Sequence, residues 1–190
     1  RNLLPVRAPY TRFSDKASRH RVIEGFGMPL TRIKRVREKV PGSSLNDIFI
    51  CVASGAVHKY LEVKGELPEQ SLMSLMPISL RTDASAGGND VSGVQVKICS
   101  DIAEPIERLI AVHHETRASK VQAEKMGLDM LKNVFEVMPS MLVDSLMRNL
   151  ILPSINLATS NVRGPDKPIY LAGAKAMCMY PVSIPADGAG

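Results

Sequence analysis

The adjacent histidines His113 and His114 are the first candidates for acid–base chemistry in this sequence of 190 residues. A histidine acts as a general base only when its ring can reach the proton that it removes. Both lie inside a segment that predicts a helix beginning at Pro105. His113 falls on the same helical face as Ile106 and Ile110. We therefore interpret His113 as a half-buried structural histidine.

The run Ser44-Leu45-Asn46-Asp47 places a hydroxyl three residues before a carboxylate, which is a variant of the capping box at the start of helices. This cap explains Asp47, because its carboxylate accepts hydrogen bonds from free amide groups and interacts with the positive end of the helix. Capping does not explain Asn46. An amide carries two donors and an acceptor, so Asn46 is suited to orient a substrate.

Thr159, Ser160 and Asn161 end a predicted strand beside the turn Arg163-Gly164-Pro165-Asp166. Hydroxyl and amide groups at such a place are suited to stabilise an oxyanion, and one such donor is worth about 3 kcal/mol. The alternative is turn chemistry, in which Asn and Ser bond to their own backbone and Gly164-Pro165 fixes the bend. A third role is a latch, meaning a segment that crosses between two halves of a larger protein.

Basic residues are concentrated near the start of the chain. Residues 1–40 hold eleven Lys and Arg against three acidic residues, whereas the remainder holds 13 basic and 16 acidic residues. Three interpretations of this charge stay open. The basic residues contact the phosphates of a small ligand, they contact an anionic membrane surface, or they face solvent alone. Nucleic acid is disfavoured, because no aromatic residues or nucleic-acid module accompany the charge. The candidate phosphate contacts are Arg32, Lys34, Arg35 and Arg37 on one predicted helix, together with Arg81 and Arg163.

The three cysteines, Cys51, Cys99 and Cys178, lie inside apolar runs without the spacing of a disulfide framework or a zinc site. We expect them to be reduced core residues of a cytosolic protein. No apolar run approaches the roughly eighteen residues that a membrane-spanning helix needs. No secretory leader is visible, and the first residues look like the middle of a larger polypeptide.

Helices and strands alternate in the predicted order of elements. Helices are expected over residues 30–40, 45–61 and 105–124, with further helical segments over 126–152 that break at Pro139. Strands are expected over 22–28, 72–80, 91–99, 154–160 and 170–180. The helix over 45–61 is apolar on most of its circumference and should be buried centrally. This order predicts an α/β domain with a mixed sheet over residues 21–190, entered through a linker over 1–20.

Three stretches of the chain together resemble one enzyme family, the bacterial wax ester synthase/diacylglycerol acyltransferases. The chain resembles the C-terminal half of these enzymes from about residue 21 to residue 190. The Asn-Val-Arg-Gly-Pro run is the most specific marker of this resemblance. The chain stops where the family continues with a further strand and helix. The stretches are Ser44-Leu45-Asn46-Asp47-Ile48, Ser160-Asn161-Val162-Arg163-Gly164-Pro165, and Tyr170-Leu171-Ala172-Gly173 with Tyr180-Pro181-Val182-Ser183 and Ala186-Asp187-Gly188.

The resemblance implies a chloramphenicol-acetyltransferase-like fold, in which this chain is the second half of a two-domain enzyme. The first half of the family carries a His-His-x-x-x-Asp-Gly motif, whose second histidine acts as the general base on an alcohol. In this sequence His113-His114 is followed by Ala118-Ser119 where the motif has Asp-Gly. The catalytic histidine is therefore expected in the N-terminal half, and the isolated chain is expected to be inactive.

The reaction implied by the resemblance is transfer of a fatty acyl group from acyl-CoA to a fatty alcohol or diacylglycerol, without a metal or redox cofactor. The implied partners are these substrates and the N-terminal half, and a membrane or lipid-droplet surface and a homodimer are further candidates. Two alternatives stay open, a non-catalytic lipid-binding module and a peripheral membrane-docking domain. The residues that we expect to support the active site are Asn46, Asp47, Thr159, Ser160 and Asn161, and those that we expect to form the latch are Arg163, Gly164 and Pro165.

Overall fold

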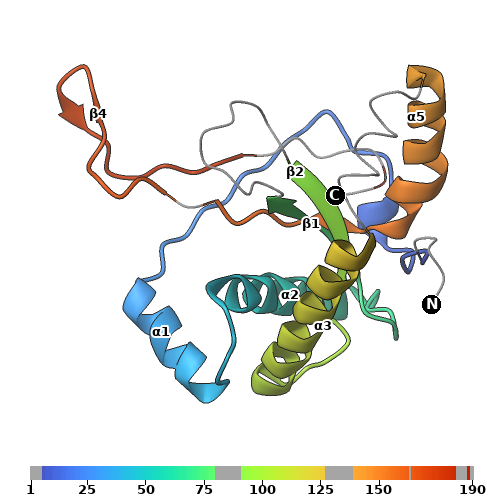
Figure 1. The fold of residues 1–190 in the computed structure, drawn as a ribbon, viewed down its shortest axis with the longest axis horizontal. Helices are drawn as coiled ribbons and strands as arrows, with labels where there is room; N and C mark the ends of the chain where they lie inside the picture. The colour runs from blue at the N-terminus through green and yellow to red at the C-terminus, as the bar shows by residue number, and fades with distance from the viewer. Residues whose placement is uncertain (1–5, 80–90, 127–138, 163, 183–187, 189–190) are drawn as a thin grey trace.

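A small mixed sheet packs against two long helices in this computed structural model, which describes residues 6–79, 91–126, 139–162, 164–182 and 188 (Figure 1). The predicted class, α/β with a mixed sheet flanked by helices, is confirmed. In chain order the elements are a 3-10 helix Arg12–Ser14, α1 (Leu30–Lys39), α2 (Leu45–Lys64), β1 (Met73–Ser79), β2 (Val91–Lys97), α3 (Pro105–Met126), α5 (Ser140–Leu146), a π-helical turn Met147–Ile151, a 3-10 turn Leu152–Ser154, β3 (Leu157–Ala158), β4 (Tyr170–Leu171) and β5 (Ala174–Lys175).

The main sheet has the order β2-β1-β3, with β1 antiparallel to β2 and parallel to β3. Met73 pairs with Lys97 in the antiparallel ladder, and Ser74 pairs with Leu157 in the parallel one. Because side chains alternate along a strand, one face of the sheet is apolar and meets the helices. That face contains the buried side chains of Leu72, Met76, Val94, Val96 and Ile98.

Helix α2 begins where the sequence predicts and extends three residues beyond the predicted end at residue 61. Ser44 and Asp47 form the capping box, and Gly65 ends the helix in the left-handed conformation with φ of +67°. The prediction that α2 is buried around most of its circumference is wrong, because Phe49 and Val52 are more than 40% exposed. A helix on one face of a sheet buries only the stripe that meets the sheet and the neighbouring helix.

Helix α3 begins at Pro105 as predicted, but a different stripe of it is buried. Leu109 and Val112 face the core, whereas Ile106 and Ile110 are about 40% exposed. The spacing of the buried residues continues through Thr116 to Ala123. The buried stripe is therefore rotated relative to the predicted face of Ile106, Leu109, Ile110 and His113, of which Leu109 is buried, because the stripe also includes polar residues.

The remaining strand predictions hold only in part. Residues 22–28 form no strand, since none of their backbone groups joins a ladder, and Gly25 lies against the ring of Tyr180. Pairing in the predicted strand 154–160 is confined to β3, because the preceding residues form a 3-10 turn. Within 170–180 only β4 and β5 pair, around Ala172 and Gly173 with φ of +49° and +82°.

The beginning of the described chain is held against the domain by polar contacts. Ala8 N donates to the carbonyl of Pro153 at 3.0 Å, and Asn156 Nδ2 donates to the carbonyl of Pro9 at 2.7 Å. The guanidinium of Arg12 pairs with the Glu66 carboxylate at 2.6 Å. These contacts fall inside the predicted linker, and its boundary at residue 20 stays a prediction.

The cysteines differ in exposure. Cys51 and Cys99 are buried as predicted, but Cys178 is exposed and is not a core residue, because the segment around it leaves the core. Burial raises the pKa of the Cys51 thiol, and it raises that of Cys99 to about 12 with help from Glu115 and Asp101. None of the described helices is both long and apolar enough to cross a membrane.

We expect a thiol reagent at mildly alkaline pH to modify Cys178 in the folded chain while Cys51 and Cys99 react only after unfolding. The thiolate is the reactive form, and both burial and the raised pKa suppress it at the two core positions. Mass spectrometry of alkylated peptides, with and without denaturant, measures the three rates. Modification of Cys99 as fast as Cys178 in the native protein would contradict this burial.

Candidate functional site

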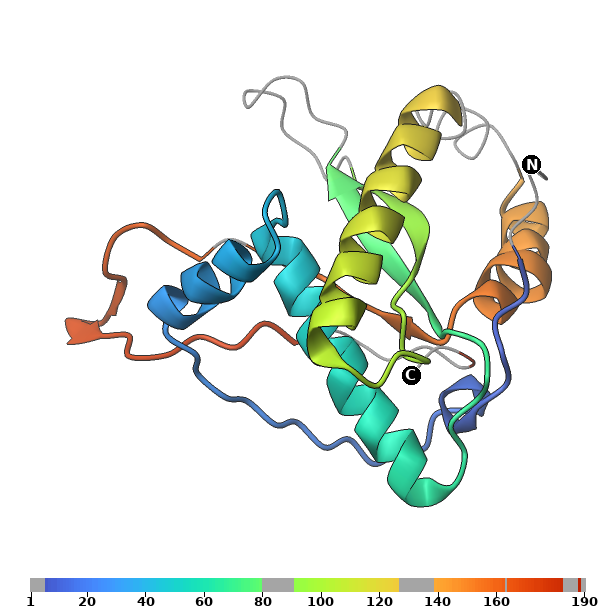
Figure 2. The same ribbon diagram turned by 90° about the horizontal axis from the view of Figure 1, so that it is seen from below.

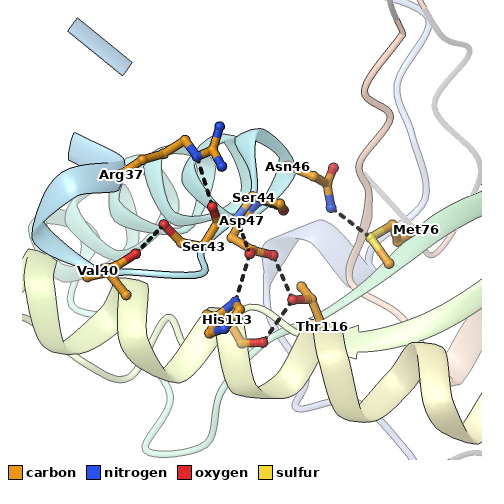
Figure 3. Close-up of polar contacts among 9 residues, drawn as sticks. All are labelled: Arg37, Val40, Ser43, Ser44, Asn46, Asp47, Met76, His113 and Thr116. Carbon is orange, nitrogen blue, oxygen red and sulfur yellow. Dashed lines mark hydrogen bonds and ion pairs between the residues drawn. The ribbon is translucent and has the colours of Figure 1, made fainter. Parts of the chain in front are cut away.

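The polar site at the start of α2 is built by a short turn from α1 (Figure 3). Gly42, with φ of +86°, lets the chain reverse after Val40. Ser43 Oγ donates to the Val40 carbonyl at 2.8 Å, and Arg37 Nε donates to the Ser43 carbonyl at 2.9 Å. The turn therefore presents Ser44 at a defined position as the cap of α2.

The carboxylate of Asp47 is the centre of this site and is only 2% exposed. Its Oδ2 accepts the Ser44 backbone N–H at 2.7 Å and Nδ1 of His113 at 3.0 Å. Its Oδ1 accepts the Thr116 hydroxyl at 2.6 Å. The carboxylate thus joins the first turn of α2 to the middle of α3 (Figure 3).

Hydrogen bonding determines the ionisation of Asp47. Burial alone raises its pKa, but the donors from Ser44, Thr116 and His113 outweigh burial and lower the pKa below its usual value. Asp47 is therefore ionised at neutral pH, and it accepts the hydrogen bonds that an ionised carboxylate requires. His113 is half-buried and bound to Asp47, which agrees with its interpretation as a structural histidine.

Asn46 and Thr159, two of the predicted site residues, lie over the same strand, β1. Asn46 Nδ2 donates to Met76 Sδ at 3.2 Å. The Thr159 hydroxyl is 2.9 Å from that of Ser74, and Thr159 N donates to the Leu75 carbonyl at 3.0 Å. Ser74 and Met76 are two residues apart and so share the face of β1 that meets the helices. The sheet therefore brings together two positions that are 113 residues apart in the sequence.

The other predicted site residues do not join this group. Ser160 and Asn161 are exposed, as are Gly164 and Pro165. The backbone bends at Asp166 and Lys167, and the predicted turn over 163–166 includes Arg163, which is not among the described residues. Arg81 and Arg163 lie outside the described residues. Arg32, Lys34 and Arg35 are exposed on α1. A depression of about 250 Å³ between α1 and the turn is lined by Lys34, Arg37, Glu38, Gly42 and Ser43.

The comparisons with known proteins agree with one another. The WS/DGAT C-terminal domain, a family of the wax ester synthase/diacylglycerol acyltransferases, matches residues 87–190. This chain belongs to the WS/DGAT family. The sequence is 32% identical to a putative diacylglycerol O-acyltransferase of Mycobacterium tuberculosis over 98% of this chain and 39% of that protein. It is 27% identical to the O-acyltransferase WSD of Acinetobacter baylyi over 95% of this chain and 40% of that protein.

A solved structure of the family has the same fold. The wax ester synthase/diacylglycerol acyltransferase from Marinobacter aquaeolei VT8 superposes with a TM-score of 0.75 and 27% sequence identity, over 95% of this chain and 41% of that chain. This WS/DGAT chain therefore spans about two fifths of the length of each of these relatives. It corresponds to the C-terminal domain of a two-domain enzyme.

Three residues of the WS/DGAT site were not found from the sequence. Thr116 lies three residues after His113, so helical spacing was a usable signal for it. Ser74 and Met76 carried no signal, because their partners Thr159 and Asn46 lie 85 and 30 positions away in the chain. The residues omitted from the sequence analysis are thus mostly those on β1.

The lowered pKa of Asp47 predicts an acid-sensitive contribution to stability. Because the folded-state pKa lies below the unfolded value, this contribution is full above about pH 4 and is lost as the pH falls through the folded-state pKa. Asp47→Asn should lower the free energy of unfolding at pH 7 by about 1–3 kcal/mol, and the loss should shrink under acid conditions. Urea titrations at several pH values measure both effects. The exposed carboxylate replacement Asp101→Asn is the matched control, and equal pH profiles for the two variants would contradict the role of Asp47.

Thr116→Val tests the contact between α2 and α3 without changing side-chain volume appreciably. Loss of the hydroxyl removes a donor from a buried carboxylate, so we expect a destabilisation of about 1.5–3 kcal/mol. The same replacement at the exposed Thr31 of α1 should change stability by less than about 0.5 kcal/mol. Thermal and urea unfolding of the two variants supply the comparison, and equal effects would argue against a buried contact.

Proposed function

We propose that this chain forms the C-terminal half of an O-acyltransferase that moves a fatty acyl group from acyl-CoA to a long-chain alcohol or to diacylglycerol. Membership of the WS/DGAT family is the observation that carries this proposal. The names of the relatives support it, since they include a diacylglycerol O-acyltransferase and a wax ester synthase. The products are wax esters or triacylglycerol.

In the proposed reaction the alcohol oxygen attacks the thioester carbonyl, the C–O bond forms, and the C–S bond breaks to release CoA as a thiol. A general base takes the proton from the alcohol, and the same proton passes to the departing sulfur. The base is a histidine of the N-terminal half, because this sequence contains no His-His-x-x-x-Asp-Gly motif. The proposed reaction uses neither a metal nor a redox cofactor.

Asn46 is the residue of this chain that we place nearest to the reacting groups. Among the described residues its amide donates to a thioether sulfur, which is a weak acceptor, and Asn46 is only partly buried. A substrate carbonyl oxygen is a stronger acceptor and would take over this hydrogen bond. The developing oxyanion is stronger still, so the contact favours the transition state over the bound substrate. Asp47 holds Asn46 in place through the first turn of α2.

Thr159 lies directly after β3, over the same strand β1 as Asn46, and its hydroxyl, buried beside that of Ser74, holds the end of β3 in place. Ser160 and Asn161 follow Thr159 directly in the chain and are exposed. The latch role of residues 163–165 rests on the path of the chain after them, which leaves the core and ends in the β4–β5 hairpin (Figure 1). Arg32, Lys34, Arg35 and Arg81 remain proposed contacts to the phosphates of CoA, and a homodimer remains a prediction.

The full-length protein should make ester and release CoA thiol when given a long-chain acyl-CoA and either hexadecanol or diacylglycerol. Residues 1–190 alone should make none, and activity should return when the N-terminal half is added. Thiol release and thin-layer separation of the lipid products measure the reaction. Turnover by residues 1–190 alone would overturn the assignment of the base. A full-length protein that binds acyl-CoA without turnover would favour the non-catalytic lipid-binding alternative.

Asn46→Ala in the full-length enzyme should lower kcat by about a hundredfold, with a smaller change in KM, because one oxyanion donor is lost. The matched control is Asn149→Ala, which removes an exposed amide that bonds only to Ser145. Asn46→Asp keeps the side-chain shape but removes the donor, so it should be as inactive as Asn46→Ala. Full activity in Asn46→Asp would contradict a donor role for this residue.

A further inference from the structure

Helix α3 is held in place independently of the polar site at the start of α2. It crosses α2 and packs against β2 (Figure 2). Near its beginning the buried guanidinium of Arg108 donates to the carbonyls of Ile102 and Ala103, both at 2.7 Å. Farther along the helix Ser119 Oγ donates to the Gln95 carbonyl of β2 at 3.3 Å. Helix α3 is therefore a fixed reference against which the start of α2 can be oriented.

Two side chains of α3 between these anchors hold the Asp47 carboxylate, one at each oxygen (Figure 3). The Thr116 hydroxyl donates to Oδ1 at 2.6 Å, and Nδ1 of His113 donates to Oδ2 at 3.0 Å. Residues three apart lie on the same side of a helix, so both donors reach one carboxylate. The carboxylate cannot rotate without breaking one of these hydrogen bonds, so α3 fixes its orientation as well as its place.

Both donors direct a proton at Asp47. Thr116 Oγ1 also lies 3.1 Å from the His113 carbonyl, but a hydroxyl has one proton, and the ionised carboxylate is the closer and stronger acceptor. An ionised carboxylate only accepts hydrogen bonds, so Nδ1 of His113 carries a proton. The other side of this ring faces the turn before α2, since a Cβ at Gly42 would lie 3.6 Å from Nε2. His113 is therefore oriented from two sides.

Asp47 passes its position to Asn46 through the first turn of α2. Its Oδ2 accepts the Ser44 backbone N–H at 2.7 Å, and Ser44 Oγ accepts the Asp47 backbone N–H at 3.1 Å. Asn46 lies between these two residues in the chain. Its amide donates to the sulfur of Met76, which is a weak acceptor. The direction of the Asn46 amide therefore depends mainly on the backbone that Asp47 holds.

We propose that Thr116 and His113 are positioning residues for acyl transfer, which act on Asn46 through Asp47. A donor to an oxyanion must point at the place where negative charge develops, and a misplacement of about 1 Å can cost about a hundredfold in rate. When either hydrogen bond from α3 is lost, the carboxylate can turn and the first turn of α2 can shift relative to β1. In this role the two residues contact neither the substrate nor the reacting atoms.

This inference rests on the proposed function, because it takes Asn46 as the donor to the oxyanion. It adds α3, which supplies none of the proposed active-site residues, to the elements that determine the rate. A purely structural role for Thr116 and His113 would lower the stability of the protein and leave the rate of the folded enzyme unchanged. Measuring kcat and stability on the same variants therefore separates the two roles.

Replacements of the two donors in the full-length enzyme test the proposal, with palmitoyl-CoA and hexadecanol as substrates. Thr116→Val removes the hydroxyl and should lower kcat by at least about tenfold, while KM for each substrate changes by less than about threefold. Thr116→Ser keeps the hydroxyl and should retain at least about half of kcat. His113→Phe should lower kcat as Thr116→Val does, whereas His113→Asn keeps an N–H donor and should retain more activity than His113→Phe.

Two other positions of α3 provide matched controls. Val112→Ala removes buried methyl groups without touching Asp47, so it should lower the thermal unfolding temperature and leave kcat unchanged. His114→Asn replaces the exposed neighbouring ring and should change neither quantity. The kinetics are measured at a temperature at which circular dichroism shows every variant to be folded. Equal losses of kcat in Val112→Ala and Thr116→Val would overturn the proposal.

A double-mutant cycle tests whether the effect passes through Asn46. In that case Asn46→Ala/Thr116→Val should have a kcat within about twofold of that of Asn46→Ala, because the donor to be positioned is already absent. Losses that multiply, or a normal kcat in Thr116→Val, would refute the positioning role and leave the proposed function intact. A normal kcat in Asn46→Ala would remove Asn46 from the site and this inference with it. Failure of the unmodified enzyme to make any ester would refute the proposed function and this inference together.

Discussion

One buried carboxylate holds the two long helices of this domain at a fixed relative position. Asp47 accepts hydrogen bonds from its own helix cap and from two side chains of α3. A buried ionised group is tolerated only when such partners surround it, so the start of α2 and the rotation of α3 about its axis are determined together. The neighbouring Asn46 takes its position from this arrangement, because a residue in the first turn of a capped helix has little freedom to move.

The hydrogen bonds around Asn46 and Thr159 are weaker than those of Asp47. Asn46 donates to a methionine sulfur, and Met76 itself belongs to the core. Thr159 reaches the same face of β1 from a strand that pairs over only two residues. The start of α2 is held firmly, whereas the hydrogen bond from Asn46 to the methionine sulfur is weak. This combination suits a site that binds a substrate, because the weak hydrogen bond costs little to break when the substrate takes its place.

The surface of the domain divides into regions of different composition. Residues 22–30 and α1 combine exposed apolar residues with cations, whereas the C-terminal segment 176–182 is apolar and uncharged. Both leave the small core formed by α2, α3 and the sheet, and they contact each other where Gly25 meets Tyr180.

The sequence by itself determined what depends on neighbouring residues. The capping box at Ser44 and Asp47 and the start of α3 at Pro105 are both local, and the structure confirms each of them. The motifs that resemble WS/DGAT enzymes could also be recognised from the sequence, because each of them is a run of neighbouring residues. Only the tertiary structure decided that Thr116 and His113 meet Asp47, that Asn46 and Thr159 share β1, that α2 is exposed at Phe49 and that Cys178 lies at the surface. These contacts join residues far apart in the chain, and burial and hydrogen bonding across such distances depend on packing that no local pattern encodes.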